Sequence, residues 1–321
     1  MIKGCYIMKF IDSAAVENTA SVTDWIDAME QAMVKSLTGE LILPGRLHLD
    51  RGDDTFLLMP CIDDSYWVTK LVSFCPGNSS LGHPSIYGTV VLNSSATGEP
   101  LALIEGASLT ANRTAAVTAL GIKYLTDMNA ERLGIIGTGT QGIHQAIFAC
   151  TIRPVKKVTI SDRSVTAIEK FEQEFKRHFQ DITLTVADDT WKVCNESDIV
   201  ITATNSKDPV FPENPGIFRD QTFIGTGSYK PDCREYPDAF YKCIRQIFTD
   251  TLHGLKESGD LIHPVKKGLI SREHVHSLGS LIKKDVILSH APVRFFKTVG
   301  SAIFDLFAAR LIYEKSLQRT D

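Results

Sequence analysis

The stretch "LGIIGTGTQGIHQ", Leu133–Gln145, is typical of the turn between a buried strand and the helix that follows it. Gly137, Gly139 and Gly142 match the spacing G-x-G-x-x-G. In that motif the first glycine permits a tight turn, the second lets the backbone approach a pyrophosphate, and the third lets helix and strand pack closely. The N–H groups at the start of the helix also offer positive charge to phosphates. The motif alone is weak evidence for a dinucleotide site, so the surrounding sequence is needed to support it.

The next predicted strand strengthens the case for a dinucleotide. The segment "KVTIS", residues 157–161, is followed by Asp162, which lies 20 residues beyond Gly142. An acidic residue about 20 residues past the motif binds the adenosine ribose hydroxyls in Rossmann folds. We therefore predict that the glycine turn and the end of this strand bind the cofactor, through Gly137, Thr138, Gly139, Thr140, Gln141, Gly142, Asp162, Arg163 and Ser164.

The choice between NAD and NADP stays open in the sequence. Asp162 would repel a 2′-phosphate and therefore favours NAD. Arg163 and Ser164, which follow it directly, are residue types that bind such a phosphate in NADP enzymes. We expect NAD(H) or NADP(H), with NAD slightly favoured.

The segments around the motif predict two domains. From residue 109 onward a long helical run leads to the glycine turn, and strands then alternate with helices, which favours an α/β, doubly wound parallel sheet. Before it, a helix begins at Ser21 and short strands separated by turns predict an antiparallel sheet. The last helix should return to this first domain with one apolar face, made of Ile303, Phe304, Phe307 and Leu311. We predict a Rossmann domain over residues 113–300 and a discontinuous α+β domain over residues 1–112 and 301–321.

Composition excludes several classes of protein. A formal net charge of −4 over 321 residues gives no electrostatic reason to bind nucleic acid. No apolar run approaches the roughly 18–20 residues that span a bilayer, and Lys9 and Asp12 interrupt the N-terminus, unlike a secretory signal. The seven cysteines are odd in number and form no C-x-x-C pair. We expect a cytoplasmic protein with reduced thiols and no membrane partner.

Several ordered motifs follow one another over nearly the whole chain: "PGRLHLD", "VTKLVSFCPGN", "SLTANRTAAVTALGIKYL", the glycine turn, "LKESGDLIHP" and "FFKTVGSAIFDLFAARLIYE". Together they resemble the ornithine cyclodeaminase/mu-crystallin family. The resemblance implies a substrate-binding and dimerisation domain from the two ends of the chain, a Rossmann domain and a homodimer. It also implies NAD(P)-dependent chemistry at the α-carbon of a small amino or imino acid.

Three basic residues match the substrate-binding positions of that family. They are Arg46 in "PGR", Lys70 in "VTK" and Arg113 in "ANRTAA". An α-amino or α-imino acid carries a carboxylate, for which arginine offers a bidentate fork and lysine a point charge that can also move a proton. Lys70 and Arg113 lie in apolar or Ala/Thr-rich segments, where a charge needs a partner. We predict all three as catalytic and substrate-binding residues.

The resemblance also adds cofactor-binding positions outside the glycine turn. These are Thr89, Thr114, Thr204, Asn205, Gly227, Val299 and Gly300. In the last helix Asp305 recurs in the family, and we expect it either to support the site from behind or to have a surface or structural role. His144 is expected to pack or cap a helix. We predict no metal site at His274 and His276, because residues two apart on a helix point to different sides.

One segment departs from true ornithine cyclodeaminases. Those enzymes carry an aspartate in a Gly-Asp-x-Pro-Gly-Lys pattern, whereas aligning on Pro231 and Glu235 places Tyr229 at that position. A tyrosine, with an ordinary pKa of about 10, cannot act as that general base near neutral pH, but it can line a pocket or donate a hydrogen bond to the substrate. The segment is more similar to ketimine and imino-acid reductases of the family.

We therefore expect an oxidoreductase that uses NAD(P)H to reduce a small imino acid. The leading substrate is a cyclic ketimine such as Δ1-pyrroline-2-carboxylate, whose product is L-proline. The alternatives are an ornithine cyclodeaminase, which forms proline and ammonia from ornithine, and an alanine or opine-type dehydrogenase. A non-enzymatic mu-crystallin-like protein that binds NAD(P)H or a small ligand is a further alternative, against which the three basic residues argue.

Overall fold

The computed structural model describes residues 8–318, except for the side chain of Ser79. Its internal contacts divide the chain into two compact units. Unit 1 lies within residues 1–113 and 301–321, and unit 2 comprises residues 114–300. Arg113, which the sequence analysis placed at the start of the second domain, falls instead in unit 1. Within residues 8–318, no helix combines the length and the apolar character needed to cross a bilayer.

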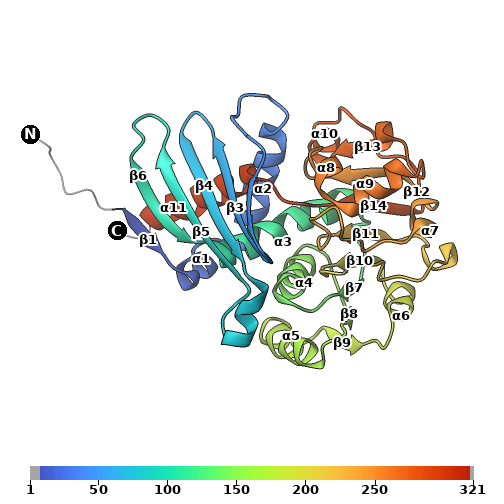
Figure 1. Ribbon diagram of the computed structural model, residues 1–321. Coiled ribbons are helices and arrows are strands. Elements are labelled where there is room, and N and C mark those ends of the chain that lie inside the picture. Colours follow the sequence, from blue (N-terminus) through green and yellow to red (C-terminus); the bar gives the residue numbers. More distant parts are fainter. Residues whose placement is uncertain (1–7, 319–321) are drawn as a thin grey trace, which may run out of the picture. The chain divides into compact units, whose positions relative to one another are not determined.

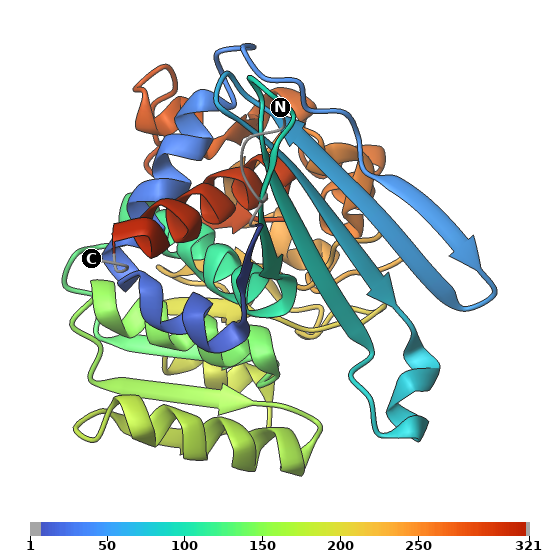
Figure 2. The ribbon, with the colours of Figure 1, turned by 90° about the vertical axis from the view of Figure 1, so that its left-hand side faces the viewer.

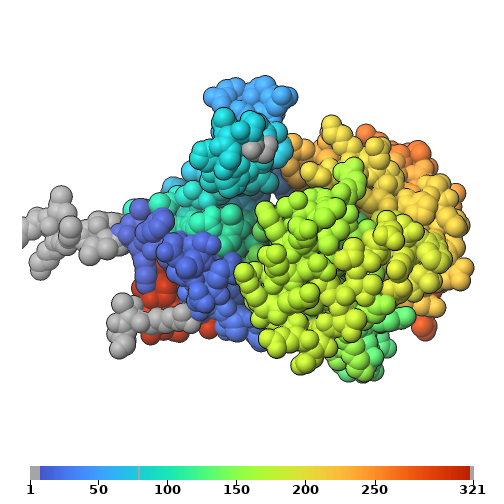
Figure 3. All heavy atoms as spheres, turned by 90° about the horizontal axis from the view of Figure 1, so that it is seen from below, coloured from blue at the N-terminus to red at the C-terminus, as the bar shows by residue number. Residues whose placement is uncertain are grey.

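Unit 1 is built on a six-stranded sheet with the order β1-β6-β5-β4-β3-β2 (Figure 1). Neighbouring strands pair antiparallel from β2 to β6, as the tight turns predict, whereas β1 pairs parallel to β6 and was not predicted. The strands are β1 (Lys9–Ile11), β2 (Leu47–Arg51), β3 (Asp54–Ile62), β4 (Tyr66–Phe74), β5 (Ile86–Ser94) and β6 (Pro100–Glu105). The turn between β2 and β3, and the short helix η1 (Pro76–Leu81), project from this unit in blue and cyan (Figure 3).

Helices cover one face of this sheet (Figure 2). They are α1 (Ser13–Thr19), α2 (Val22–Lys35) and α11 (Ala302–Gln318). The predicted start of α2 is confirmed by a capping box, in which Ser21 and Asp24 bond each other's backbone N–H groups. The prediction of a single apolar face on α11 is wrong. Residues 302–309 are all buried and Leu311 is only half-buried, because α11 packs on α2 as well as on β3, β4 and β5.

Unit 2 contains the predicted doubly wound parallel sheet. Eight strands follow the order β13-β12-β14-β11-β10-β7-β8-β9, and helices lie on both faces (Figure 1). The strands are β7 (Arg132–Ile136), β8 (Lys157–Ser161), β9 (Thr183–Val186), β10 (Ile199–Thr202), β11 (Thr222–Gly225), β12 (Ile244–Thr249), β13 (Val275–Ser277) and β14 (Val293–Lys297). The chain leaves β7 toward β8 and later returns to its other side with β10, so the strand order reverses there. Ligands of such sheets bind outside the carboxyl ends of the strands at this switch point.

The helices of unit 2 connect these strands. They are α4 (Thr140–Ile152), α5 (Val165–His178), α6 (Thr190–Asn195), α7 (Asp238–Tyr241), α8 (Gly254–Glu257), α9 (Gly259–Lys266), α10 (Leu278–Ile282), and the short helices η2 (Pro215–Ile217) and η3 (Arg272–His274). The long helix α3 (Gly106–Leu125) contributes residues to each unit. Buried aromatic rings, among them Phe223, Phe240 and Phe295, form the core on one side of the sheet.

Candidate active site

The buried face of the sheet in unit 1 carries a cluster of charged side chains. Lys70 on β4 is 2% exposed, and its Nζ lies 2.8 Å from each carboxylate oxygen of Asp305 on α11. Arg113 on α3 is also buried, with its Nε 3.2 Å from Oδ1 of Asp305. The structure therefore brings together two of the three predicted basic residues around one fully buried carboxylate.

The charges in this cluster do not balance. Burial lowers the pKa of Lys70 to about 8; Asp305 opposes this change, whereas the positive charges of Arg113 and Arg46 add to it. Arg46, the third predicted basic residue, is half-buried and close enough to influence Lys70. Asp305 can neutralise only one of these three cations. The remaining positive charge makes the cluster suited to an anion such as a carboxylate.

Asp305 is the shared anionic partner of Lys70 and Arg113. The surface role considered for it is wrong, because its side chain is fully buried against Lys70 and Arg113. The available signal was its position inside the apolar stretch "AIFDLFAAR", where an acidic residue needs a cationic partner.

Thr89 does not share a face with this cluster. On β5 it lies opposite Leu71 and Glu105, whereas Lys70 lies opposite Val90. Because successive side chains of a strand point to opposite faces, Thr89 lies on the outer face of the sheet, away from the helices. Thr114, the residue after Arg113, is half-buried in the part of α3 that belongs to unit 2.

In unit 2 the three motif glycines have the geometry that a phosphate-binding turn requires. Gly137 has a φ of +96°, which favours glycine. A Cβ on Gly142 would lie 2.1 Å from the carbonyl oxygen of Gly137, so this close packing excludes a side chain. A Cβ on Gly139 would meet nothing within 4 Å, and α4 starts at the next residue, Thr140, without a side-chain cap. The turn therefore leaves room at the start of α4 for a phosphate, which fits a dinucleotide.

Asp162 lies directly beside this turn. Its Oδ2 accepts hydrogen bonds from the backbone N–H of Thr138 at 2.7 Å and from the Thr138 hydroxyl at 3.1 Å. Its Oδ1 accepts the N–H of Ser164 at 2.9 Å. Arg163, between them, is exposed. Asp162, at the end of β8, thus fixes the glycine turn and places a carboxylate next to that turn.

Two further loops at the carboxyl edge of the sheet carry predicted residues. Thr204 and Asn205 follow β10, and Gly227 and Tyr229 follow β11. The two loops touch, since a Cβ on Gly227 would lie 1.9 Å from the carbonyl oxygen of Thr204. Asn205 is exposed and Tyr229 half-buried, with the Lys230 ammonium 5.7 Å from the centre of its ring. Both loops also bond to Glu235, a residue that the sequence analysis used only as an alignment mark.

A second buried carboxylate, Asp250, holds the turn that contains Val299 and Gly300. Its Oδ2 accepts the Thr298 hydroxyl at 2.6 Å and the N–H groups of Val299 and Gly300 at 3.0 and 2.8 Å. Its Oδ1 accepts the N–H of Thr251 at 2.8 Å. Asp250 was not predicted, because nothing in its local sequence pattern reveals partners 48–50 residues away.

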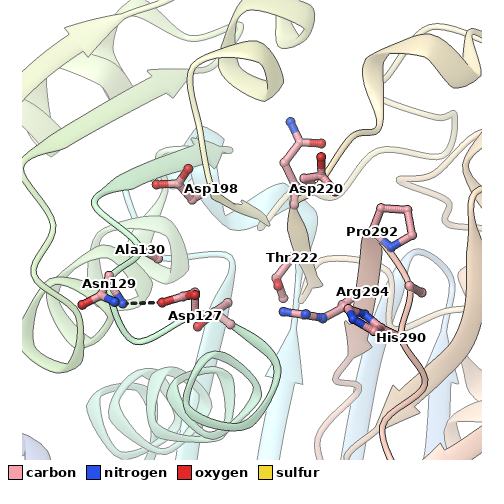
Figure 4. A pocket seen from close by; sticks show the side chains of 12 residues that line it. Asp127, Asn129, Ala130, Asp198, Asp220, Thr222, His290, Pro292 and Arg294 are labelled. Atoms are coloured by element: carbon pink, nitrogen blue, oxygen red, sulfur yellow. Dashed lines mark hydrogen bonds between the residues drawn. The ribbon is translucent and has the colours of Figure 1, made fainter.

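A cavity of about 640 Å³ in unit 2 lies at the opposite edge of this sheet (Figure 4). Its lining includes Asp127, Asp198 and Thr222, which lie before or at the starts of β7, β10 and β11. Arg294 in the same wall donates to the carbonyl of Leu125, and Asp198 accepts the N–H of Arg132. Since ligands of doubly wound sheets bind at the carboxyl ends, we assign no part of the predicted site to this cavity.

The histidines of the sequence analysis lie outside these clusters. His144 on α4 bonds the carbonyl of Thr140 one turn earlier, as a packing or capping residue does. The prediction that His274 and His276 share a helix is wrong, because His276 belongs to strand β13. Within residues 8–318, no three His, Cys, Asp or Glu side chains are grouped as metal ligands.

The reversed strand order and the glycine turn define unit 2 as a Rossmann dinucleotide-binding fold. The sequence profile of the ornithine cyclodeaminase/mu-crystallin family matches residues 8–320, and the chain belongs to this family. The predicted family and fold class are thereby confirmed.

The similarity to relatives whose activity is named extends over almost the whole chain. A Δ1-pyrroline-2-carboxylate reductase of Bacillus cereus is 32% identical over 97% of this chain and 98% of its own. The structure of Thermococcus litoralis Δ1-pyrroline-2-carboxylate reductase in complex with NADH and L-proline is 30% identical, with a TM-score of 0.90 over 98% of both chains. An archaeal alanine dehydrogenase dimer with bound NAD is 26% identical, with a TM-score of 0.89 over 98% of this chain and 97% of the other.

Proposed function

We propose that this protein is an NAD(P)H-dependent oxidoreductase that reduces the C=N bond of a small imino acid, with Δ1-pyrroline-2-carboxylate as substrate and L-proline as product. The observation that carries the proposal is the buried cluster of Lys70, Arg113 and Asp305, whose excess positive charge suits the carboxylate of such a substrate. The names of the Bacillus and Thermococcus relatives support the same substrate.

The residues of the two units divide the work in this proposal. Unit 1 supplies the basic residues that bind the substrate, and unit 2 supplies the glycine turn that binds the cofactor, which when bound supplies the hydride that reduces the α-carbon. Arg46 and Arg113 hold the substrate carboxylate, and Lys70 donates a proton to the imine nitrogen. Tyr229 lines the substrate pocket or donates a hydrogen bond. The remaining cofactor contacts come from the glycine turn and from the positions that the family resemblance adds: Thr89, Thr114, Thr204, Asn205, Gly227, Val299 and Gly300.

An assay with purified protein tests this function. Oxidation of NADH or NADPH with Δ1-pyrroline-2-carboxylate or its six-membered homologue is the expected result. No oxidation with either ketimine between pH 5 and 9 would contradict the proposal. Alanine dehydrogenase is the second candidate, favoured by the archaeal structure, and net NADH formation from alanine would identify it.

The pH profile of the reduction should reflect Lys70. The pKa of Lys70 in the free enzyme is about 8, so this group is a cationic acid below pH 8 and loses its proton above it. We expect kcat/KM for reduction to fall as pH rises through about 8, and kcat to fall at higher pH, because a bound carboxylate favours the charged lysine. In Lys70→Arg this decrease should be absent from the remaining activity, since arginine keeps its charge. An unchanged profile in Lys70→Arg would exclude Lys70 as the titrating group.

NAD is the proposed cofactor. Asp162 holds negative charge beside the glycine turn, where it would face a 2′-phosphate, whereas Arg163 is exposed. Asp162→Ser should therefore narrow or reverse the preference in kcat/KM for NADH over NADPH. Asp188→Ser, an exposed aspartate elsewhere in unit 2, is the control and should leave the ratio unchanged. A wild-type preference for NADPH would refute the cofactor assignment.

We also propose that the protein forms a homodimer through the outer face of the unit 1 sheet. Phe10, Leu47, Leu49 and Leu71 on this face are 69, 52, 50 and 43% exposed, an apolar surface of the kind that a second copy covers. Leu49→Arg should reduce the molar mass measured by light scattering to that of a monomer. Ile287→Arg, at an 84% exposed position in unit 2, should leave the dimer intact. A dimer that survives Leu49→Arg and Leu71→Arg together would place the interface elsewhere.

A further inference from the structure

Glu235 links two loops at the carboxyl edge of the unit 2 sheet. It is fully buried in the segment between β11 and α7. Its Oε1 accepts hydrogen bonds from the N–H and the hydroxyl of Thr204, at 2.8 and 2.9 Å. Its Oε2 accepts the N–H groups of Gly227 and Ser228, at 2.9 and 3.3 Å. One carboxylate thus holds the loop after β10 and the loop after β11 by four donors.

Two other buried charges surround this carboxylate. Nζ of Lys297, at the end of β14, lies 3.8 Å from Oε2 of Glu235 and 3.6 Å from Oδ2 of Asp260. The Lys297 ammonium forms no hydrogen bond within the described residues, so it acts on both carboxylates through its charge. Asp260, near the start of α9, accepts the backbone N–H groups of Glu235 and Tyr236 at 2.9 and 3.2 Å. Asp260 therefore fixes the backbone of Glu235, and Lys297 offsets the negative charge.

Burying Glu235, Lys297 and Asp260 together is an inefficient way to stabilise the fold. Burying three ionisable groups requires their desolvation, and well-packed apolar residues of similar volume often stabilise a fold as well or better. An ionised carboxylate, however, accepts hydrogen bonds at both of its oxygens, whereas an amide accepts them at only one and an apolar side chain accepts none. The four donors come from the same two loops that carry Thr204, Asn205, Gly227 and Tyr229.

We infer that Glu235 is a positioning residue for the cofactor: its carboxylate fixes the backbone of Thr204 and of Gly227–Ser228 in the conformation that binds the dinucleotide, with Lys297 as its counter-charge. The inference rests on the proposed cofactor-binding role of these two loops. Glu235 should therefore affect the affinity for the cofactor. It should not affect the cluster of Lys70, Arg113 and Asp305, whose residues all belong to unit 1.

A pair of variants separates positioning from stability. Glu235→Gln replaces one acceptor oxygen by a donor group that faces backbone N–H donors, so NADH affinity, measured by its fluorescence, should fall roughly tenfold to a hundredfold. Lys297→Met is the second variant, because it removes the cation from the same buried cluster but leaves the Glu235 carboxylate and its four donors in place. It should lose thermal stability but keep most of the NADH affinity. If Lys297→Met loses as much NADH affinity as Glu235→Gln at a similar loss of stability, Glu235 has only a structural role and the inference is overturned.

Glu213→Gln is the matched control. The Glu213 carboxylate also accepts two backbone N–H groups in unit 2, those of Asp238 and Ala239, but it binds neither loop. This variant should lose some stability and keep its NADH affinity within about twofold. If Glu235→Gln also binds NADH within about twofold of wild type, the inference fails while the proposed function stands. If the wild-type protein binds NADH but reduces no imino acid, the proposed reaction is wrong and the inference about Glu235 still holds. If it binds neither NADH nor NADPH, both the proposed function and the inference are wrong.

Discussion

Replacing Lys70 by methionine is expected to lower kcat for imine reduction by roughly 10²–10⁴-fold, the usual contribution of a positioned proton donor. Methionine suits the apolar surroundings of this buried strand position, and Asp305 keeps Arg113 as a partner. The fold should therefore persist. Steady-state kinetics with saturating substrate measures the loss.

Two measurements show whether that loss is specific. NADH affinity should be unchanged in Lys70→Met, because the proposed cofactor turn belongs to unit 2. Lys156→Met, at a lysine whose side chain is 72% exposed, removes a charge of the same kind and should leave kcat unchanged. A kcat in Lys70→Met within tenfold of wild type would show that Lys70 does not supply the proton.

Asp305→Asn is expected to cause the largest loss of stability. The substitution leaves Lys70 and Arg113 buried without an anion, and breaking a buried ion pair in this way costs about 3–5 kcal/mol of unfolding free energy. Urea unfolding followed by circular dichroism measures the change. Glu314→Gln is the control on the same helix, since Glu314 forms a more exposed pair with Arg310, and such pairs contribute about 0–1 kcal/mol.

The loss in Asp305→Asn should depend on pH. The pKa of Lys70 is already below that of an ordinary lysine, and removal of Asp305, which raises it, will lower it further. A basic group whose pKa is depressed in the folded state costs stability when it is charged, and this cost decreases as pH rises past the folded-state pKa. The destabilisation should therefore be smaller at pH 9 than at pH 6. A loss below 1 kcal/mol at pH 6 would contradict the role of Asp305.

Local patterns allowed much of the fold to be predicted. The alternation of strands and helices after residue 109, the glycine spacing and the capping box at Ser21 are all determined by neighbours within a few residues, and the structure has each of them. The three-residue strand β1 was missed because so short a segment has no readable period. The apolar face of α11 was mispredicted because the helix is buried on several sides, which hides the 3.6-residue period.

Much of the candidate site was predicted from the family resemblance. Lys70 and Arg113 matched substrate-binding positions of the family, and their charges in apolar or Ala/Thr-rich segments supported that prediction. Glu235 and Asp250 were not predicted, because their hydrogen bonds reach residues 31 and 48–50 positions away in the chain. Such contacts depend on which strands become neighbours. Strand pairing also decides that Thr89 lies on the face of the sheet opposite to Lys70.

The two-part composition of unit 1 has a consequence for biosynthesis. A ribosome makes the strand with Lys70 and the helix with Arg113 early, but it makes Asp305 only after all of residues 114–300. Until then the two cations lack the anion that makes their burial tolerable, whereas every strand of unit 2 has already been synthesised. Unit 2 should consequently fold first on the nascent chain, and the N-terminal segment should remain open to proteases and chaperones until α11 emerges.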